Sequence, residues 1–197
     1  FKRLPYNERA YKKLLGVPSL GGEKGFTTFE RTWVRPTCDV NGITGGYQGE
    51  GAKTIIPSYA SCKITMRLVP GMDPKDIGNK IEKYLKKIAP KSVRVKIDKF
   101  GGAKAVVIPT DSPWLEAATG AIKTGFGKEP VFMMEGGSIP IVNDFKSALG
   151  LETLLIGFGQ NDDNIHSPNE RLRLVDFERG CKTAAVLPGE LLKVSSK

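Results

Sequence analysis

The sequence is poor in histidine and cysteine, and it lacks long apolar runs. Its 197 residues include one histidine, three cysteines and no apolar run near the roughly 20 residues that span a bilayer. One histidine is too few for a complete two-zinc site, because each zinc takes about three protein ligands. The cysteines (Cys38, Cys62 and Cys181) have no CxxC spacing, which favours reduced thiols in the cytoplasm. A Cys38–Cys62 bridge on paired strands is the less favoured alternative.

No signal peptide is recognisable at the start of the sequence, and no membrane contact is predicted. The first residue is Phe1 rather than Met, which predicts that the chain is a piece of a longer protein. The net charge of +9 raises the question of nucleic acid. The basic residues are spread along the chain, however, and one cluster lies on the predicted exposed face of a helix: Lys80, Lys83, Lys86 and Lys87. We therefore predict no nucleic-acid partner, while the surface suits anionic ligands.

The first half of the chain predicts an α+β arrangement. A helix is expected at residues 7–15 and a strand at 27–35, whereas the five glycines of NGITGGYQGEG predict tight turns instead of regular structure. Residues 59–69 alternate between apolar and polar side chains and predict the clearest strand. Asp73 and Pro74 then begin an amphipathic helix that Pro90 ends, and residues 93–97 predict another half-buried strand.

The second half of the chain predicts an α/β arrangement. Its expected elements are a helix from Ser112 and Pro113 with Leu115, Ala118, Ile122 and Phe126 inward, a strand at 131–134, a helix ending at Leu149, a buried strand at 151–158 and a helix at 176–192 that Pro188 kinks. Alternating strands and helices predict a parallel sheet. The predicted domains are residues 1–109, with an antiparallel sheet and a helix, and residues 110–197.

The only histidine, His166, lies in the segment GFGQNDDNIHSPNE, directly after the expected strand at 151–158. Loops that leave the carboxyl ends of such strands commonly hold ligands. A neutral imidazole there is a suitable zinc ligand, and Asp162 and Asp163 could orient it. A solvated loop histidine is the alternative reading.

Three further positions could hold a substrate carboxylate or carbonyl. Ser138 follows the glycine pair of EGGS at an expected helix start, where free N–H groups favour an anion. Arg67 lies on the polar face of its expected strand and could bind a carboxylate through two N–H groups. Thr54, in AKTIIP, offers a hydroxyl at a strand edge. Taken singly, each has an ordinary structural alternative: a tight turn, an exposed strand arginine and a structural threonine.

Four segments in register resemble one enzyme family: RPTCDVNGITGGYQGEGAKTIIP, RLVPGMDP, EGGSIPI and GFGQNDDNIHSPNE. They resemble the zinc metallopeptidases that include carnosinase, cytosolic dipeptidase, aminoacylase, carboxypeptidase G, acetylornithine deacetylase and succinyl-diaminopimelate desuccinylase. The resemblance implies an α/β catalytic domain interrupted by a lid domain that commonly dimerises. Residues 1–109 would be the later part of the lid, and residues 110–197 the C-terminal segment of the catalytic domain.

The same resemblance implies roles for single residues. His166 would be the last zinc ligand, Thr54 and Arg67 would hold substrate from the lid, and Gly137 with Ser138 would bind the terminal carboxylate of the substrate. The other ligands, the general-base glutamate and a lid histidine of the family are expected upstream of Phe1. The chain alone is therefore expected to be inactive.

The function expected from the resemblance is a metal-dependent hydrolase, a dipeptidase or other exopeptidase that cleaves small peptides with a free carboxyl end. Two zinc ions per site are implied, with manganese or cobalt as possible substitutes, and a homodimer through the lid domain. Two alternatives stay open at this point: an N-acyl amino acid deacylase of the same family, and a dimerisation or binding module without catalysis.

Overall fold

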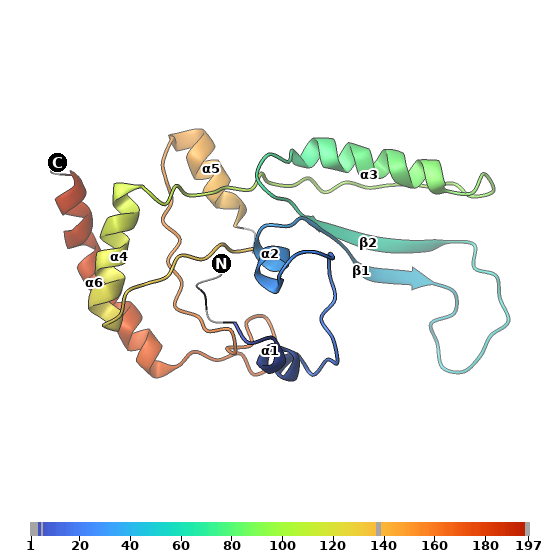
Figure 1. The fold of residues 1–197 in the computed structure, drawn as a ribbon. Helices are drawn as coiled ribbons and strands as arrows, with labels where there is room; N and C mark the ends of the chain where they lie inside the picture. The colour runs from blue at the N-terminus through green and yellow to red at the C-terminus, as the bar shows by residue number, and fades with distance from the viewer. Residues whose placement is uncertain (1–3, 5, 137–138, 196–197) are drawn as a thin grey trace. The chain divides into compact units, whose positions relative to one another are not determined.

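The computed structural model describes residues 4, 6–136 and 139–195 of the chain (Figure 1). It divides into two compact units: Phe1–Val106 with Met133–Asn143, and Val107–Phe132 with Asp144–Lys197. The elements are, in order, α1 (Glu8–Leu15), α2 (Thr28–Trp33), β1 (Thr37–Gly45), β2 (Ala60–Arg67), α3 (Pro74–Ile88), α4 (Pro113–Phe126), α5 (Pro140–Leu149) and α6 (Leu174–Ser195). The domain boundary at residue 109 stays a prediction.

The first unit begins with two short helices, and only one of them was predicted. In α1, the Asn7 side chain accepts the Ala10 N–H at 2.9 Å, which begins the helix where the sequence predicted it. The strand predicted at residues 27–35 is wrong, because this segment forms α2. Thr27 and Glu30 build a capping box there, each side chain accepting the backbone N–H of the other residue. That reciprocal cap outweighs the β propensity of the neighbouring threonines and aromatic residues.

The sheet of the first unit is an antiparallel pair, β1 and β2, which confirms the predicted strand and the antiparallel arrangement. The glycine-rich segment is more regular than predicted, because its first part belongs to β1. Asn41 is the extra residue of a β-bulge, since Val40 lies opposite Ile64 while Gly42 lies opposite Lys63. A Cβ on Gly42 would lie 3.2 Å from the Lys63 side chain, so glycine suits this close approach.

The two strand cysteines do not face each other. Cys38 lies opposite Met66 and Cys62 lies opposite Ile43. Both are free and exposed, as is Cys181. The strand register therefore agrees with the prediction of reduced thiols and not with a Cys38–Cys62 bridge.

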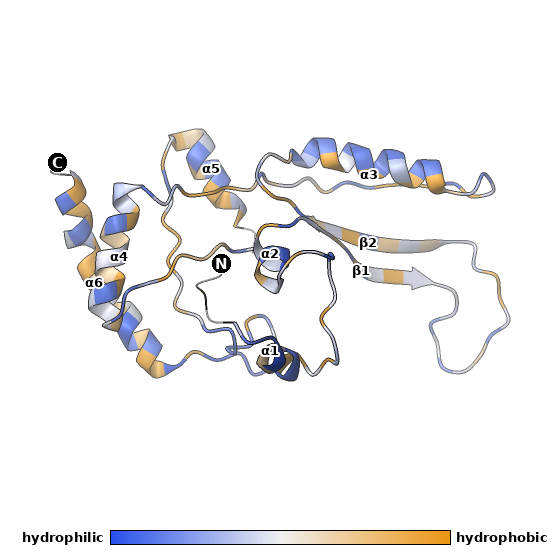
Figure 2. Cartoon of the chain, viewed as in Figure 1, coloured by the Kyte–Doolittle hydropathy of each residue, from blue (hydrophilic) through white to orange (hydrophobic). Residues whose placement is uncertain are grey.

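Helix α3 confirms the predicted helix, with Asp73 as its N-cap and Pro74 in its first turn. Apolar and polar residues alternate along it in Figure 2, and the four lysines singled out in the sequence are exposed. Residues 93–97 are not a strand. The chain beyond them is held to α3 by side chains: Lys99 bonds Glu82 at 2.8 Å and Asn79 at 2.9 Å. Hydrogen bonds from Lys86 and Lys99 lower the pKa of Glu82 to about 2, so this carboxylate is charged at neutral pH.

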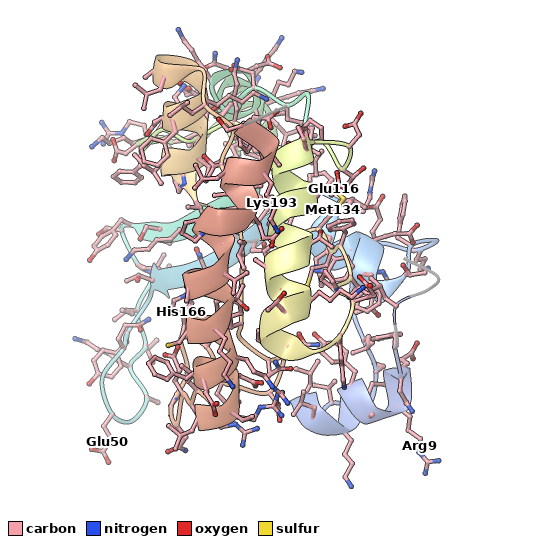
Figure 3. The ribbon with its side chains drawn as sticks, turned by 90° about the vertical axis from the view of Figure 1, so that its left-hand side faces the viewer. Arg9, Glu50, Glu116, Met134, His166 and Lys193 are labelled. Carbon is pink, nitrogen blue, oxygen red and sulfur yellow. The ribbon has the colours of Figure 1, made fainter. Side chains whose placement is uncertain are left out.

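The second unit is organised by α4 and α6, which pack antiparallel. Gly120 lies near Glu190, and Gly125 lies near Arg179 and Thr183. Figure 3 shows the same direction, with Glu116 of α4 and Lys193 of α6 at one end of the pair. The inward side of α4 is formed by Ala117, Ala118 and Ala121, which are buried. Of the four residues predicted inward, Ala118 is buried and the other three are half-buried.

Gly125 sets the distance between these two helices. A Cβ at this position would lie 2.7 Å from the Arg179 carbonyl oxygen and would overlap the Thr183 hydroxyl. We expect Gly125→Ala to destabilise the fold by about 1–3 kcal/mol through overpacking. Gly120→Ala is the matched control, since its Cβ would meet only the flexible end of Glu190, at 3.4 Å. It should be neutral or stabilising by up to about 1 kcal/mol because alanine favours helix. Urea unfolding of both variants tests this, and equal stabilities would contradict it.

The strands predicted in the second half are absent from the described residues. Residues 131–134 and 151–158 have no ladder partner there, and 151–158 alternate between half-buried and exposed positions instead of being fully buried. Ser112 precedes α4 as predicted, but its hydroxyl donates to Glu152 at 3.0 Å and accepts no backbone N–H from the helix start. Helix α5 ends before Gly150, which has the left-handed φ of 66°. Helix α6 continues through Pro188. Among the helices described, none combines the length and apolar character needed to cross a membrane.

Candidate functional site

The loop that carries His166 is a closed ring of backbone. The Arg171 N–H donates to the Asp163 carbonyl at 2.9 Å, so the seven residues between them form a tied loop. On the other side of Asp163, its N–H donates to the Gln160 carbonyl at 3.1 Å, and its Oδ2 accepts the Gln160 N–H at 2.7 Å. Both ends of the loop are therefore joined at one residue, Asp163.

His166 lies at a tight turn within this loop. The Ser167 N–H donates to the Asn164 carbonyl at 2.8 Å, which closes the turn. His166 has a φ of 64°, the left-handed conformation that a type II turn requires at its third position. Asn164 and Asn169 are also left-handed, with φ values of 54° and 60°. Asparagine and histidine adopt this conformation more often than most residues, but it is uncommon outside glycine, so surrounding contacts have to hold it.

The imidazole of His166 is exposed and is drawn among the side chains of Figure 3. Within the described part of the chain it makes no hydrogen bond. Asp162 and Asp163 do not orient the imidazole as predicted, because both carboxylates face Arg171. Asp162 forms an ion pair with the Arg171 guanidinium, and Asp163 Oδ1 lies 3.7 Å from Arg171 Nε.

The metal implied by the sequence resemblance can be tested against these donors. His166 fits as one ligand, since both ring nitrogens are available and its backbone is fixed. Among the residues that the structure describes, no group of three or more His, Cys, Asp or Glu side chains could hold a metal ion. The described chain therefore offers one candidate ligand and no complete site.

The predicted lid residues lie in the first unit. Arg67 is the last residue of β2, opposite Thr37 of β1, and it is exposed. Thr54 is also exposed, but it does not lie at a strand edge as predicted. It belongs to the irregular connection between β1 and β2. Both roles stay predictions.

Gly137 and Ser138, the predicted carboxylate-binding pair, lie outside the described residues. Their neighbour Gly136 is described, and its backbone packs against the last turn of α2. A Cβ on Gly136 would overlap the carbonyl oxygen of Thr32. The close contact of this glycine is thus with the protein's own backbone.

Sequence reasoning missed the part that Arg171 has in the loop. Its backbone N–H closes the loop, and its guanidinium faces two aspartates. The available signal was the Asp-Asp pair followed by an arginine nine residues after Asp162, a spacing that only a closed loop brings together.

Residues 7–93 match the family model described as the M20 peptidase dimerisation domain. The chain is a relative of the M20 peptidases. This confirms the resemblance drawn from the four sequence segments, including the predicted lid or dimerisation domain in the first half.

Two curated relatives of the chain are dipeptidases. The Cys-Gly metallodipeptidase of Saccharomyces cerevisiae is 35% identical over 158 residues, which are 78% of this chain and 32% of the relative. The Beta-Ala-His dipeptidase of Rattus norvegicus is 29% identical over 172 residues, which are 83% of this chain and 34% of the relative. The chain thus spans about a third of the length of these relatives.

Two solved M20-like structures share the fold. Human carnosine dipeptidase 1 superposes with a TM-score of 0.82 at 26% identity, covering 98% of this chain and 41% of that chain. An M20 family metallo-carboxypeptidase from Sulfolobus solfataricus superposes with a TM-score of 0.81 at 30% identity, covering 94% of this chain and 42% of that chain.

Proposed function

We propose that these residues are the later part of a metal-dependent M20 hydrolase that cleaves dipeptides or other small peptides with a free carboxyl end. The observation that carries the proposal is the exposed imidazole of His166, held on a closed loop in a chain related to metallodipeptidases. The remaining metal ligands and the general base would come from outside the described residues.

In this proposal the chain's own residues bind the metal and orient the substrate. His166 is one metal ligand, zinc being the metal proposed, with manganese or cobalt as substitutes. When bound, the metal supplies an activated water and polarises the scissile carbonyl. The Arg67 guanidinium holds a carboxylate or carbonyl oxygen of the substrate through charge-assisted hydrogen bonds. Thr54 adds a hydroxyl, and Gly137 and Ser138 add contacts to the terminal carboxylate. Holding the substrate in this way lowers the entropic part of the barrier.

The competing activity is hydrolysis of N-acyl amino acids. The relatives and solved structures named above are three dipeptidases and a carboxypeptidase, which favours peptide substrates. The deciding experiment measures kcat/KM of the full-length enzyme that carries these residues, on Cys-Gly, β-Ala-His and an N-acetyl amino acid with added Zn²⁺ or Mn²⁺. Higher kcat/KM on the acetylated substrate would reject the dipeptidase proposal, and no metal-dependent hydrolysis at all would reject both.

We also propose that the enzyme is a homodimer joined through the lid, because residues 7–93 match a dimerisation domain. The two-stranded sheet supports this proposal, since each strand has an edge that no other strand of the described residues pairs with. Sedimentation equilibrium should give twice the mass of one chain, and a monomer at about 100 µM would contradict the proposal. The free thiols of the three cysteines suit a cytoplasmic location.

A further inference from the structure

Two adjacent aspartates in the His166 loop have opposite environments. The side chain of Asp162 is 55% exposed, whereas that of Asp163 is 2% exposed. A buried carboxylate is costly unless it is paired and hydrogen-bonded. Asp163 has one hydrogen bond to its carboxylate, from Gln160, and its other oxygen has no hydrogen-bond partner among the described residues. Arg171 Nε, at 3.7 Å, is the cation that faces it.

The buried carboxylate of Asp163 lies at the base of the His166 loop, where the two ends of the loop meet. Through its carboxylate and its backbone, Asp163 joins Gln160 on one side and Arg171 on the other. The turn that holds His166 in its left-handed conformation begins at the next residue, Asn164. Removing the Asp163 carboxylate would release the Gln160 N–H and the Arg171 guanidinium at the base of this loop, and so loosen the segment whose backbone aims the imidazole.

We propose that Asp163 is a positioning residue for His166: it fixes the loop so that the imidazole meets the metal in one orientation, without contacting the metal itself. This rests on the proposed role of His166 as a ligand. It differs from the orienting contact expected from the sequence, because the Asp163 carboxylate holds the base of the loop and makes no hydrogen bond to the ring.

Asp176 provides a matched control for burial and charge. It lies in α6 of the same unit, its side chain is 2% exposed like that of Asp163, and it is paired with Arg173 at 2.6 Å and Arg179 at 3.5 Å. It takes no part in the hydrogen bonds that close the His166 loop. Replacing either aspartate by alanine removes a buried charge and lowers stability, but only the change at Asp163 removes side-chain contacts at the base of the His166 loop.

The test measures Zn²⁺ affinity of the full-length enzyme by competition with a chromophoric chelator, well below the melting temperature of each variant. Asp163→Ala should raise the Zn²⁺ dissociation constant by about 10- to 100-fold, as loss of a group that orients a ligand commonly does. Asp163→Asn should lose less, because its amide oxygen can still accept the Gln160 N–H. Asp176→Ala should bind Zn²⁺ like wild type. With Co²⁺ in place of Zn²⁺, only the Asp163 variants should shift the visible absorption bands.

Unchanged Zn²⁺ affinity in Asp163→Ala would overturn the proposal, and so would an equal loss in Asp176→Ala, since that loss would follow from general destabilisation. If Asp163→Ala does not fold, Asp163→Asn decides in the same way, because its Zn²⁺ affinity should lie measurably below that of wild type. A His166→Asn variant measured alongside separates the two proposals: wild-type Zn²⁺ affinity there would reject His166 as a ligand.

Discussion

Replacing His166 by asparagine should remove metal from the full-length enzyme and lower kcat/KM by at least about 100-fold, because losing a ligand costs more than losing one of its outer partners. Asparagine is a sharper choice than alanine at this position. His166 has a φ of 64°, a conformation that costs most residues about 1–2 kcal/mol. Asn164 and Asn169 hold the same conformation in this loop, so asparagine keeps the backbone and removes only the imidazole.

Metal content by atomic absorption and thermal unfolding of the apo-enzyme check this result together. We expect less bound zinc with an unchanged melting temperature of the metal-free protein. Added Zn²⁺ at high concentration should recover part of the activity. If the variant kept its full zinc content, His166 would be the solvated loop histidine that the sequence also allowed.

Replacing Arg67 by alanine should lower kcat/KM by roughly 10- to 200-fold while metal content stays constant. The estimate comes from the ~1.5–3 kcal/mol of a charge-assisted hydrogen bond to substrate. Arg67→Lys should recover only part of the loss, because an ammonium group cannot bind a carboxylate through two parallel N–H groups. The measurement is steady-state kinetics on a dipeptide, with zinc content determined on the same samples.

Arg9→Ala is the matched control, since Arg9 is an exposed arginine on α1 with no predicted role in the site (Figure 3). It should keep wild-type kinetics. A kcat/KM for Arg67→Ala within twofold of wild type would leave Arg67 as an ordinary exposed strand residue.

The helices could be predicted because their signals are local. Asn7 and Asp73 accept backbone N–H groups within three residues, and Pro74 and Pro113 occupy first turns. The helix α2 was missed although its capping box is equally local, because Thr27 and Glu30 stand among residues that also favour strands. The run at 151–158 was read as a buried strand from its apolar character, but a strand also needs a hydrogen-bonded neighbour, which a single segment cannot specify.

Some features of the candidate site could likewise be predicted from the sequence, and others could not. His166 could be found because it is the only histidine and stands in a segment that resembles a known family. The difference between Asp162 and Asp163 could not be found, since two identical neighbours look alike until the loop closes through Arg171. Burial of a polar side chain is a property of the folded loop and has no local pattern.

The close contact between Gly136 and the Thr32 carbonyl has a genetic consequence. Every missense change that a single base substitution can make in a glycine codon adds a Cβ, and a Cβ here overlaps backbone that has no flexible side chain to move aside. The codon for residue 136 should therefore tolerate synonymous changes only. In a population of alleles, its variation would be confined to the third base, independently of any ligand bound nearby.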